Sequence, residues 1–284
     1  MASFSPYGGT DNLTRSSAIS TGPGSTPRDR PAGLTVAVLT RDRPDLLLPL
    51  MADLDTVVRQ LGSQGLGAEV VIGDTGSRDP DVLAAYAEAP PEVTVVPDMV
   101  YHFSANNNAL VRSAPVGFDT LLLLNNDVHL GGAVAVTAML AALAEPETGI
   151  VGLRMTFPDG SVQHEGIELV PNGFRRGLPW HPGRGEVYRP GPPRYRAAAV
   201  TGACLMIRRS LWDCLGGLDE QYERECQDVD LCFAARRSGW GITVVDAGPI
   251  VHLENATRGM GDGSITDRRL FLRRWRTFTT AVRP

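Results

Sequence analysis

The chain has 284 residues, of which 43% are hydrophobic, and a formal net charge of -5. This acidic balance excludes a general nucleic-acid binder, because such a protein needs a broad basic surface to contact phosphates. All 27 basic residues are arginine. The absence of lysine excludes Schiff-base chemistry and the Walker-type phosphate loop, since both need a lysine amine. The length predicts one domain of catalytic size.

Residues 1–33 are rich in Ser, Thr, Gly and Pro and contain no apolar run long enough for a signal peptide or a membrane span. We therefore expect a flexible leader, followed by a cytoplasmic protein. The four cysteines form no Cys-x-x-Cys pair. The sequence thus predicts neither a zinc framework nor a redox site, and we expect reduced thiols that pack in the core.

The first half of the chain contains four apolar runs that each predict a strand, at 34–39, 69–72, 93–96 and 121–124. Segments with helical spacing of apolar residues lie between them, at 47–61, 82–87 and 103–111. Repeated strand-helix units predict a parallel sheet with helices on both faces. The polar residues that follow the first, second and fourth strands are then expected to line one crevice, at the carboxyl edge of the sheet.

The fourth predicted strand consists of four leucines that run directly into Asn125, Asn126 and Asp127. A wholly apolar run of this kind predicts a strand buried on both faces, and its carboxyl end is where open α/β sheets bind ligands. Asp127 taken alone has two interpretations. It caps a helix predicted over 131–143, or it contributes to a site together with other polar residues.

The loop after the second predicted strand contains Asp74, which also has two interpretations of about equal weight. As a structural residue it closes an Asx turn or caps a helix. As a functional residue it binds the base or ribose of a nucleotide. The loop does not match Gly-x-Gly-x-x-Gly, so a nicotinamide cofactor is not predicted.

In the second half of the chain, Asp228 stands at the start of a helix predicted to end near Ser238. Helical spacing places Asp228 on the same face as Ala235, whereas Asp230 points elsewhere. A carboxylate on an inward face needs a partner or a function, and accepting a proton as a general base is one such function. The alternative is a charge that stabilises the amino end of the helix.

His252 follows a strand predicted at 242–245, after Gly248 and Pro249. A His near the end of a strand is more often a hydrogen-bonded structural residue than a metal ligand. Paired with Asp127, however, it provides nitrogen and oxygen ligands suited to a divalent ion such as manganese.

Short motifs follow one another in a definite order between residues 34 and 260. They are Thr40-Arg41, Gly73-Asp74-Thr75-Gly76-Ser77, Phe103-Ser104-Ala105-Asn106-Asn107-Asn108, Asn125-Asn126-Asp127, Phe157-Pro158-Asp159-Gly160, Thr201-Gly202, Gly216-Gly217-Leu218-Asp219-Glu220, Gln227-Asp228-Val229-Asp230 and His252. Each motif alone is weak, but the ordered set resembles the family 2 glycosyltransferases of the GT-A fold, including the rhamnosyltransferase-like subgroup.

The resemblance implies an α/β fold with a mostly parallel central sheet flanked by helices and a smaller sheet on the acceptor side. One domain would span 34–262, with a nucleotide-binding half at 34–130 and an acceptor half at 131–262. The implied reaction is an inverting transfer from a UDP- or dTDP-sugar to a hydroxyl of a sugar, a lipid-linked or a small-molecule acceptor.

The resemblance also assigns roles to individual residues. Donor binding is expected from Thr40, Arg41, Asp42, Asp74, Asn107, Asn126 and Gly202. Asp127 and His252 would hold a divalent metal, Mn²⁺ or Mg²⁺, and Asp228 would be the general base.

Three residues depart from the family pattern. Asn125 stands at the first aspartate of the metal motif, so fewer charges hold a metal. Gln227 replaces an acidic residue before the base, which removes a like charge that would raise the pKa of the base. His102 stands where glycine is common before Phe103. Because of Asn125 and Gln227, a catalytically silent sugar-nucleotide-binding protein is the alternative, whereas nucleotidyl transfer ranks last since 40–44 contains no glycine.

Two further regions have two interpretations each. The segment 172–194 is dense in Gly, Pro and Arg and predicts a long loop, either an acceptor-binding lid or a surface linker. The last residues, 263–284, form a basic, amphipathic tail. The tail contacts an anionic membrane through 266–278, or it is a terminal helix packed on the domain with its arginines in water. The sequence predicts no oligomeric state.

Overall fold

The computed structural model describes residues 32–254 and 264–281, and most of the predicted leader lies outside this part of the chain. The helices are α1 (Pro44–Ser63), α2 (Pro80–Ala87), α3 (Phe103–Ser113), α4 (Val134–Leu143), α5 (Arg209–Leu215), α6 (Gln227–Arg237) and α7 (Ile265–Ala281). The strands are β1 (Gly33–Thr40), β2 (Gly67–Asp74), β3 (Val93–Val96), β4 (Thr120–Asn125), β5 (Val128–His129), β6 (Thr148–Thr156), β7 (Val162–His164), β8 (Glu168–Leu169), β9 (Pro179–Trp180), β10 (Arg194–Arg196), β11 (Cys204–Arg208) and β12 (Gly241–His252).

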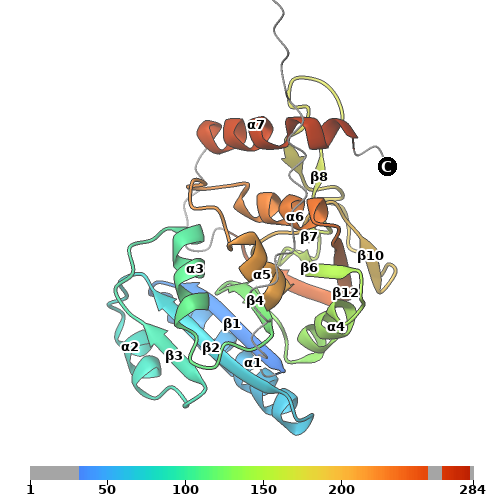
Figure 1. The fold of residues 1–284 in the computed structure, drawn as a ribbon. Coiled ribbons are helices and arrows are strands. Elements are labelled where there is room, and N and C mark those ends of the chain that lie inside the picture. The colour runs from blue at the N-terminus through green and yellow to red at the C-terminus, as the bar shows by residue number, and fades with distance from the viewer. Residues whose placement is uncertain (1–31, 255–263, 282–284) are drawn as a thin grey trace, which may run out of the picture.

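A central sheet runs through the whole molecule in the order β10-β12-β6-β11-β4-β1-β2-β3 (Figure 1). The strands β4, β1, β2 and β3 are parallel, as their strand-helix order predicts. The short strand β11 runs antiparallel between β4 and β6, so it joins the first half of the chain to the second half. A separate small sheet consists of β8 and β9. The α/β fold with a smaller second sheet is therefore confirmed.

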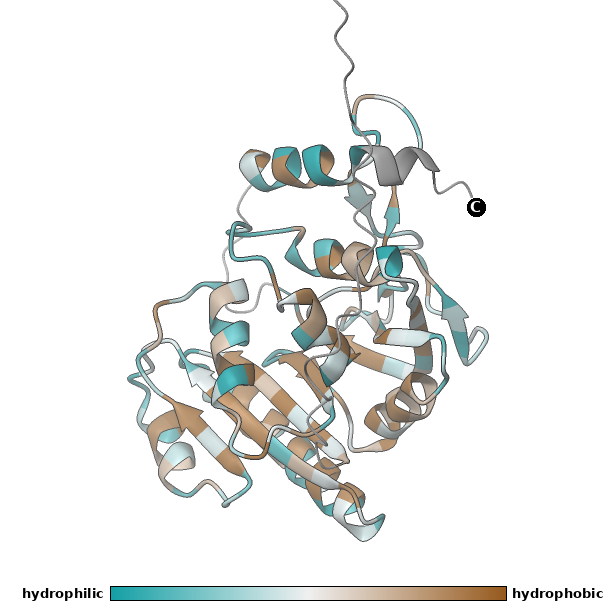
Figure 2. Cartoon of the chain, viewed as in Figure 1, coloured by the Kyte–Doolittle hydropathy of each residue, from teal (hydrophilic) through white to brown (hydrophobic). Residues whose placement is uncertain are grey.

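The leucine strand β4 explains why the sheet is buried on both faces. Leu122 and Leu124 belong to one hydrophobic core, which α1 and α4 cover. Leu121 and Leu123 point the other way, into a second core that α3, α5, α6 and α7 cover. Figure 2 shows the apolar central strands between helices with polar outer faces. A strand covered by helices on both faces needs apolar residues at every position, as residues 121–124 provide.

Strand register places the predicted loops at one edge of the sheet. Thr40 pairs with Asp74 at the ends of β1 and β2, and Leu39 pairs with Asn125 at the end of β4. The polar residues after these three strands therefore start from the same level of the sheet. The three strands thus end at one edge as predicted, but the cavity at this edge is lined by the residues after β4 and not by those after β2.

The strand β12 is longer than the predicted strand 242–245, because it continues through Gly248 and Pro249 to His252. Its pairing with β6 shifts register between Val245 and Ile250, so the Gly-Pro segment forms an irregularity inside one strand. A proline is tolerated there because a bulge needs no ladder hydrogen bond from its nitrogen. His252 consequently sits at the end of a central strand.

The helix α7 packs against α6 through the aromatic residues of both helices. Phe271 and Trp275 are each at most 1% exposed, and both contact the ring of Phe233 edge to face. Burial of two large aromatic side chains contributes several kcal/mol of hydrophobic stabilisation. The start of the predicted tail is thus part of the second core. Within 32–254 and 264–281, no helix combines the length and the apolar character that crossing a bilayer requires.

Candidate active site

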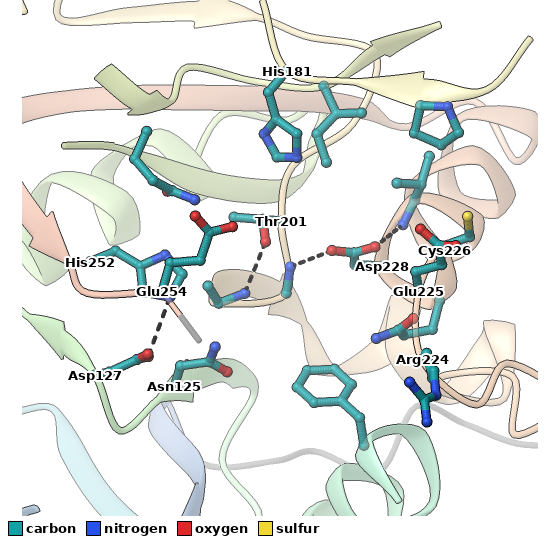
Figure 3. A pocket seen from close by; sticks show the side chains of 18 of the residues that line it. Asn125, Asp127, His181, Thr201, Arg224, Glu225, Cys226, Asp228, His252 and Glu254 are labelled. Atoms are coloured by element: carbon teal, nitrogen blue, oxygen red, sulfur yellow. Dashed lines mark hydrogen bonds and ion pairs between the residues drawn. The ribbon is translucent and has the colours of Figure 1, made fainter. Parts of the chain in front are cut away.

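A cavity of about 370 Å³ opens at the carboxyl end of β4, and segments far apart in the sequence form its walls (Figure 3). Asp127 and His252 lie together on one side of the cavity, and Asp228 lies on the other side. The segment 201–203 runs between the two sides. The structure therefore brings the predicted base and the predicted metal ligands into one cavity.

Asp228 lies in the first turn of α6, and backbone groups hold both oxygens of its carboxylate. Oδ2 accepts a hydrogen bond from the Gly202 N–H at 2.8 Å, and Oδ1 accepts one from the Val229 N–H at 2.8 Å. The first of these bonds crosses from α6 to the segment before β11. Asp228 is thus more than a charge at a helix end, because its orientation is fixed toward the cavity.

Gly202 is required by the close approach of this segment to its neighbours. A Cβ atom at position 202 would lie 3.2 Å from the Phe103 ring and 3.4 Å from the Cβ of Asp228. A larger side chain would therefore displace the aromatic ring, the carboxylate or both. Gly202 lines the cavity, and its predicted role in donor binding stays a prediction.

The backbone before α6 adopts an uncommon conformation at Cys226, whose φ is 70°. Left-handed backbone is rare for residues with a Cβ, and such strain concentrates at functional sites. Burial raises the pKa of the Cys226 thiol, and the carboxylates of Glu225 and Asp228 raise it further. The thiol therefore stays protonated, which excludes it as a nucleophile near neutral pH.

Asp127 and His252 meet across the end of the sheet, a contact that their separation in sequence does not reveal. The Nε2 atom of His252 lies 3.2 Å from Oδ1 of Asp127, and both side chains are almost fully buried. Asp127 does not cap α4, because that helix starts after Ala133 with no side-chain cap. The backbone also joins the two segments, since the Leu253 N–H donates to the Asp127 carbonyl at 3.0 Å.

This pair fits a divalent metal on chemical grounds. Within the described residues, Nδ1 of His252 has no hydrogen-bond partner and Nε2 contacts only Asp127, an unusual state for a buried imidazole. One carboxylate and one imidazole suit an ion such as Mn²⁺ that takes its remaining ligands from phosphate oxygens and water. Across 32–254 and 264–281, no cluster of three or more His, Cys, Asp or Glu side chains is arranged to hold a metal.

Asn125 and Asn126 connect the cavity to the loop after β1. The Asn126 side chain donates to the hydroxyl of Thr40 at 3.0 Å, and both residues are buried. Asn125 lines the cavity beside Asp127, and its backbone N–H donates to the Ala203 carbonyl at 2.8 Å. Thr40 itself lies behind Asn126 and is not part of the cavity wall.

The observed contacts of Asp74 are all structural. Its Oδ1 accepts the N–H groups of Gly76 and Ser77, each at 2.8 Å, and its Oδ2 accepts the hydroxyl of Tyr86 at 2.9 Å. These bonds form the Asx-type turn that the sequence offers as one alternative. The residue is buried and lies outside the cavity wall, so a contact with a nucleotide stays a prediction.

The remaining predicted donor residues also lie outside the cavity wall. Asp42 accepts the N–H groups of Arg78 and Asp79 at 2.6 and 3.0 Å, and these two bonds lower the pKa of its carboxyl. They tie the loop after β1 to the loop after β2. Arg41 is exposed beside them. Asn107 is buried in α3, where its side chain donates to the Phe103 carbonyl at 2.9 Å.

His181 from the acceptor half lines the cavity, at the top of Figure 3, and contacts a second histidine, His164. Nδ1 of His181, in the predicted 172–194 loop, lies 3.1 Å from Nδ1 of His164. Desolvation holds the pKa of His164 well below its usual value, and it lowers the pKa of His181 as well, against the raising effect of Asp228. Two neutral rings share one N–H in this contact, so one donates and the other accepts.

Sequence analysis missed several residues of the cavity wall, among them Gln163, Thr201, Glu225 and Glu254. Glu254 follows His252 by two residues, but its φ of 49° turns the chain in a way that no sequence pattern indicates. His181 lies in the segment 172–194, which the sequence left open between an acceptor-binding lid and a surface linker. A weak signal existed in that segment, because aromatic and imidazole residues among Gly and Pro are typical of binding loops.

The departure at His102 has a local explanation. Its backbone is extended, with φ of -155°, so the position does not need a glycine. The side chain caps α3, because Nδ1 accepts the Ala105 N–H at 3.2 Å. Helix α3 in turn holds the glycine-rich turn after α5: the Asn108 side chain donates to the Leu218 carbonyl and accepts the Leu218 N–H.

The amino end of α7 holds the loop that leads to Asp228. The carboxylate of Asp267 is fully buried and accepts the N–H groups of Glu223, Arg224 and Glu225, at 3.3, 2.8 and 3.0 Å. Arg268 adds an ion pair with Glu225 at 2.8 Å. The position of this wall of the cavity therefore depends on α7.

Asp230 is a second inward carboxylate, which corrects the expectation that only Asp228 occupies an inward face of α6. Its Oδ1 accepts the Tyr222 hydroxyl at 2.8 Å and the Trp275 indole N–H at 2.7 Å, and its Oδ2 pairs with Arg274 at 2.9 Å. The physical reason is that α6 is covered on two sides. One side meets the sheet, and the other meets α7.

Comparison with known sequences supports the resemblance, although no family model matches the chain. An uncharacterized protein y4gI of Sinorhizobium fredii is 29% identical over 81% of this chain, and the O-antigen biosynthesis protein RfbC of Myxococcus xanthus is 28% identical over 79%. The chain spans 25% and 18% of the lengths of these two relatives. An N-acetylglucosaminyl-diphospho-decaprenol L-rhamnosyltransferase of Mycobacterium tuberculosis is 26% identical over 72% of this chain and 74% of its own length.

Solved structures support the fold. GalNAc-T7, solved with UDP, GalNAc and Mn²⁺, superposes with a TM-score of 0.63 at 13% identity and covers 90% of this chain and 52% of its own. The mannosyltransferase PcManGT of Pyrobaculum calidifontis, solved with GDP-Man and Mn²⁺, has a TM-score of 0.57 at 15% identity, over 90% of this chain and 72% of its own. Together with the sequence relatives, they confirm that this chain has the GT-A fold and resembles the family 2 glycosyltransferases.

Proposed function

We propose that the protein is an inverting, metal-assisted glycosyltransferase that moves a sugar from a UDP- or dTDP-sugar to an acceptor hydroxyl, with Asp228 as the general base. One observation carries the proposal. A single cavity in a GT-A fold has Asp228 on one side and the Asp127–His252 pair on the other (Figure 3). An attacking hydroxyl and a leaving diphosphate need this separation, because inversion places them on opposite faces of the sugar.

Asp228 takes the proton of the acceptor hydroxyl as the hydroxyl oxygen attacks the anomeric carbon. Its two backbone hydrogen bonds fix the carboxylate, so little reorganisation is needed when the proton moves. The bond between the anomeric carbon and the diphosphate oxygen breaks in the same step. The electron pair of that bond leaves with the diphosphate.

Asp127 and His252 would hold the divalent metal, Mn²⁺ or Mg²⁺. When bound, the ion supplies a positive charge that stabilises the leaving diphosphate. Asn125, in place of a second carboxylate, lowers the charge at the site, so we expect weaker metal binding than in a site with two aspartates. Arg43 adds a fixed positive charge near Asp127, since the pKa of Arg43 is raised first by its bond to Asp45 and also by Asp127.

The loops after β1 and β2 would hold the nucleoside. Asp42 and Asp74 fix their shape through backbone hydrogen bonds, and Arg41 is exposed at their surface. Asn126 links these loops to the metal pair, because it contacts Thr40 and follows Asn125. The names of the rhamnosyltransferase relative and of the two solved neighbours favour a nucleotide-sugar donor and, in the relative, a diphospholipid acceptor. A cytoplasmic location stays a prediction.

Thermal unfolding with a panel of nucleotide sugars, with and without Mn²⁺, tests donor and metal together. We expect a UDP- or dTDP-sugar to raise the unfolding temperature more than a GDP-sugar does, and only with the metal present. A donor at 100 times its Kd adds about 2.7 kcal/mol to the unfolding free energy. Asp127→Asn should remove the metal dependence, whereas Asp55→Asn, an exposed carboxylate on α1, should not.

Release of free nucleotide by the donor that binds decides between an enzyme and a silent binding protein. Turnover of a bound UDP- or dTDP-sugar over a panel of hydroxyl acceptors supports the proposed function. Binding without release across the panel contradicts it and favours the silent sugar-nucleotide-binding protein.

A further inference from the structure

A second groove of about 770 Å³ lies beside the active-site cavity, between α7 and the segment before α3. Tyr101 and Arg224 line both spaces, so the groove and the cavity adjoin each other. Arg224 precedes Asp228 by four residues in the loop that α7 holds. A molecule lying in the groove can therefore extend toward the predicted base.

Three arginines line this groove: Arg224 from the loop before α6, and Arg269 and Arg273 from α7. All three side chains are exposed, and in the described part of the chain none of them forms an ion pair. The arginines of α7 that face inward differ from them. Arg268 pairs with Glu225, and Arg274 pairs with Asp219 and Asp230.

The unpaired arginines are unfavourable for the free protein. Arg269 and Arg273 are four residues apart on one helix face, and like charges at this spacing repel each other. Acidic residues are not scarce, because the chain has 32 of them against 27 arginines. A positive surface kept in a net acidic protein indicates an anionic ligand.

The carboxylates of the groove do not cancel this charge. Glu220 and Glu223 also line it. Glu220 is turned toward α3, where its Oε1 accepts the Asn108 side-chain N–H at 2.9 Å. The groove therefore carries three guanidinium groups against two carboxylates, a net positive charge, and one of the two carboxylates is held toward α3. Guanidinium groups bind phosphate oxygens in a bidentate manner, which makes phosphate the fitting anion.

We propose that this groove binds the phosphate or diphosphate group of a phosphorylated acceptor and so directs the acceptor hydroxyl toward Asp228. The inference rests on the proposed function, since it names the class of acceptor for the same site. Arg269 and Arg273 bind the phosphate oxygens, and Arg224 joins this group to the cavity. The reacting sugar of the acceptor lies in the cavity, between Tyr101 and the base.

Direct binding of two probes, farnesyl diphosphate and inorganic pyrophosphate, tests the groove without turnover. The titrations use the full chain in buffer free of divalent metal, so that the diphosphate is not drawn to Asp127 and His252.

We compare the wild type with the double variant Arg269→Gln/Arg273→Gln and with Arg59→Gln, an exposed arginine on α1. We expect the double variant to bind both probes roughly tenfold more weakly, as the loss of two exposed charge contacts predicts. Arg59→Gln should bind like the wild type.

Three results would overturn the inference: equal binding of farnesyl diphosphate by the wild type and the double variant, an equal loss in Arg59→Gln, or a loss confined to pyrophosphate. Vesicles of phosphatidylglycerol provide the fourth comparison. If the double variant loses vesicle binding but keeps farnesyl diphosphate, the arginines serve a membrane surface, and the acceptor assignment is wrong. Arg273→Glu changes the local charge by two, as the double variant does, and should lower probe affinity to a similar extent.

The donor assay separates this inference from the proposed function. The double variant should keep the thermal shift produced by the nucleotide sugar, because its changes lie outside the predicted donor site. Arginine-dependent probe binding in a protein that turns over no nucleotide sugar would contradict the proposed function and leave the phosphate groove standing. Turnover of a nucleotide sugar without arginine-dependent probe binding would support the proposed function and contradict the phosphate groove.

Discussion

The two halves of the protein use their polar residues differently. In the nucleotide-binding half, one oxygen each of Asp42 and Asp74 accepts two backbone N–H groups of the adjoining loops, and neither residue lines the cavity. In the acceptor half, Asp228 and His252 line the cavity, where a ligand can reach them. Polar residues at strand ends therefore serve two purposes, and their position in the sequence does not distinguish them.

The difference arises because the two halves join segments with different separations along the chain. The loops after β1 and β2 come from neighbouring parallel strands, so their own backbone N–H groups reach the carboxylates. The cavity joins the end of β4, the start of α6 and the end of β12, which three separate parts of the chain supply. The ends of β4 and β12 meet through the Asp127–His252 pair and through the Leu253 N–H, and Asp228 of α6 is held by the N–H of Gly202.

The largest effect is expected from Asp228→Asn, the change that tests the acceptor half directly. An amide does not take the proton of the acceptor, so transfer should fall about a thousandfold, within the range of general-base catalysis. The fold should survive, because the amide oxygen still accepts the N–H of Gly202 or Val229. Steady-state transfer and the thermal shift with donor are the two measurements.

Asp55→Asn on α1 is the matched control and should keep full transfer. If Asp228→Asn also keeps it, Asp228 is not the base. A parallel loss of donor binding and transfer would assign Asp228 a binding role instead, and the contrast between the two halves would disappear.

Asp267→Ala should have the next largest effect, because it removes the acceptor of three backbone N–H groups. Losing three part-buried hydrogen bonds to a buried carboxylate should lower the unfolding free energy by about 3 kcal/mol. Urea denaturation measures this change, and Thr266→Ala, exposed in the same turn, serves as the control. An unfolding free energy within error of the wild type would mean that α7 does not hold the loop 223–225.

The smallest effect is expected in the nucleotide-binding half, from Asp74→Asn compared with Tyr86→Phe. Both variants disturb the same internal hydrogen bond between the Tyr86 hydroxyl and Asp74. If Asp74 also contacts the nucleoside, only Asp74→Asn should raise the donor Kd, by about tenfold. Isothermal titration with the donor measures it. Equal Kd values in the two variants would leave Asp74 a purely structural role.

Sequence patterns predicted the main strands and helices of the nucleotide-binding half well, because the spacing of apolar residues reports local secondary structure. The unbroken leucines at 121–124 predicted a strand with both faces buried, and alternate leucines do enter two different cores. The helix predicted at 47–61 lies within α1. Apolar spacing reports burial because the period of side-chain direction is fixed by the backbone.

The site was predictable in part. The resemblance identified Asp127, His252 and Asp228, and all three line one cavity. It also named Thr40, Arg41, Asp42, Asp74 and Asn107, which lie outside that cavity. His181 and Glu254 were missed, because a long loop and a left-handed turn place them there, and neither has a periodic signal.

The sequence by itself determined the order of strands and helices in the nucleotide-binding half, the absence of lysine chemistry and the motifs that resemble family 2 glycosyltransferases. Only the tertiary structure decided that Asp127 meets His252, that Asp230 and Asp267 fasten α7 to the active-site loop, and that the arginines of α7 divide into paired and unpaired groups. The physical reason is the distance along the sequence over which each kind of interaction acts. Periodicity and capping act over a few residues, whereas these contacts join side chains from segments that meet only when the cores pack.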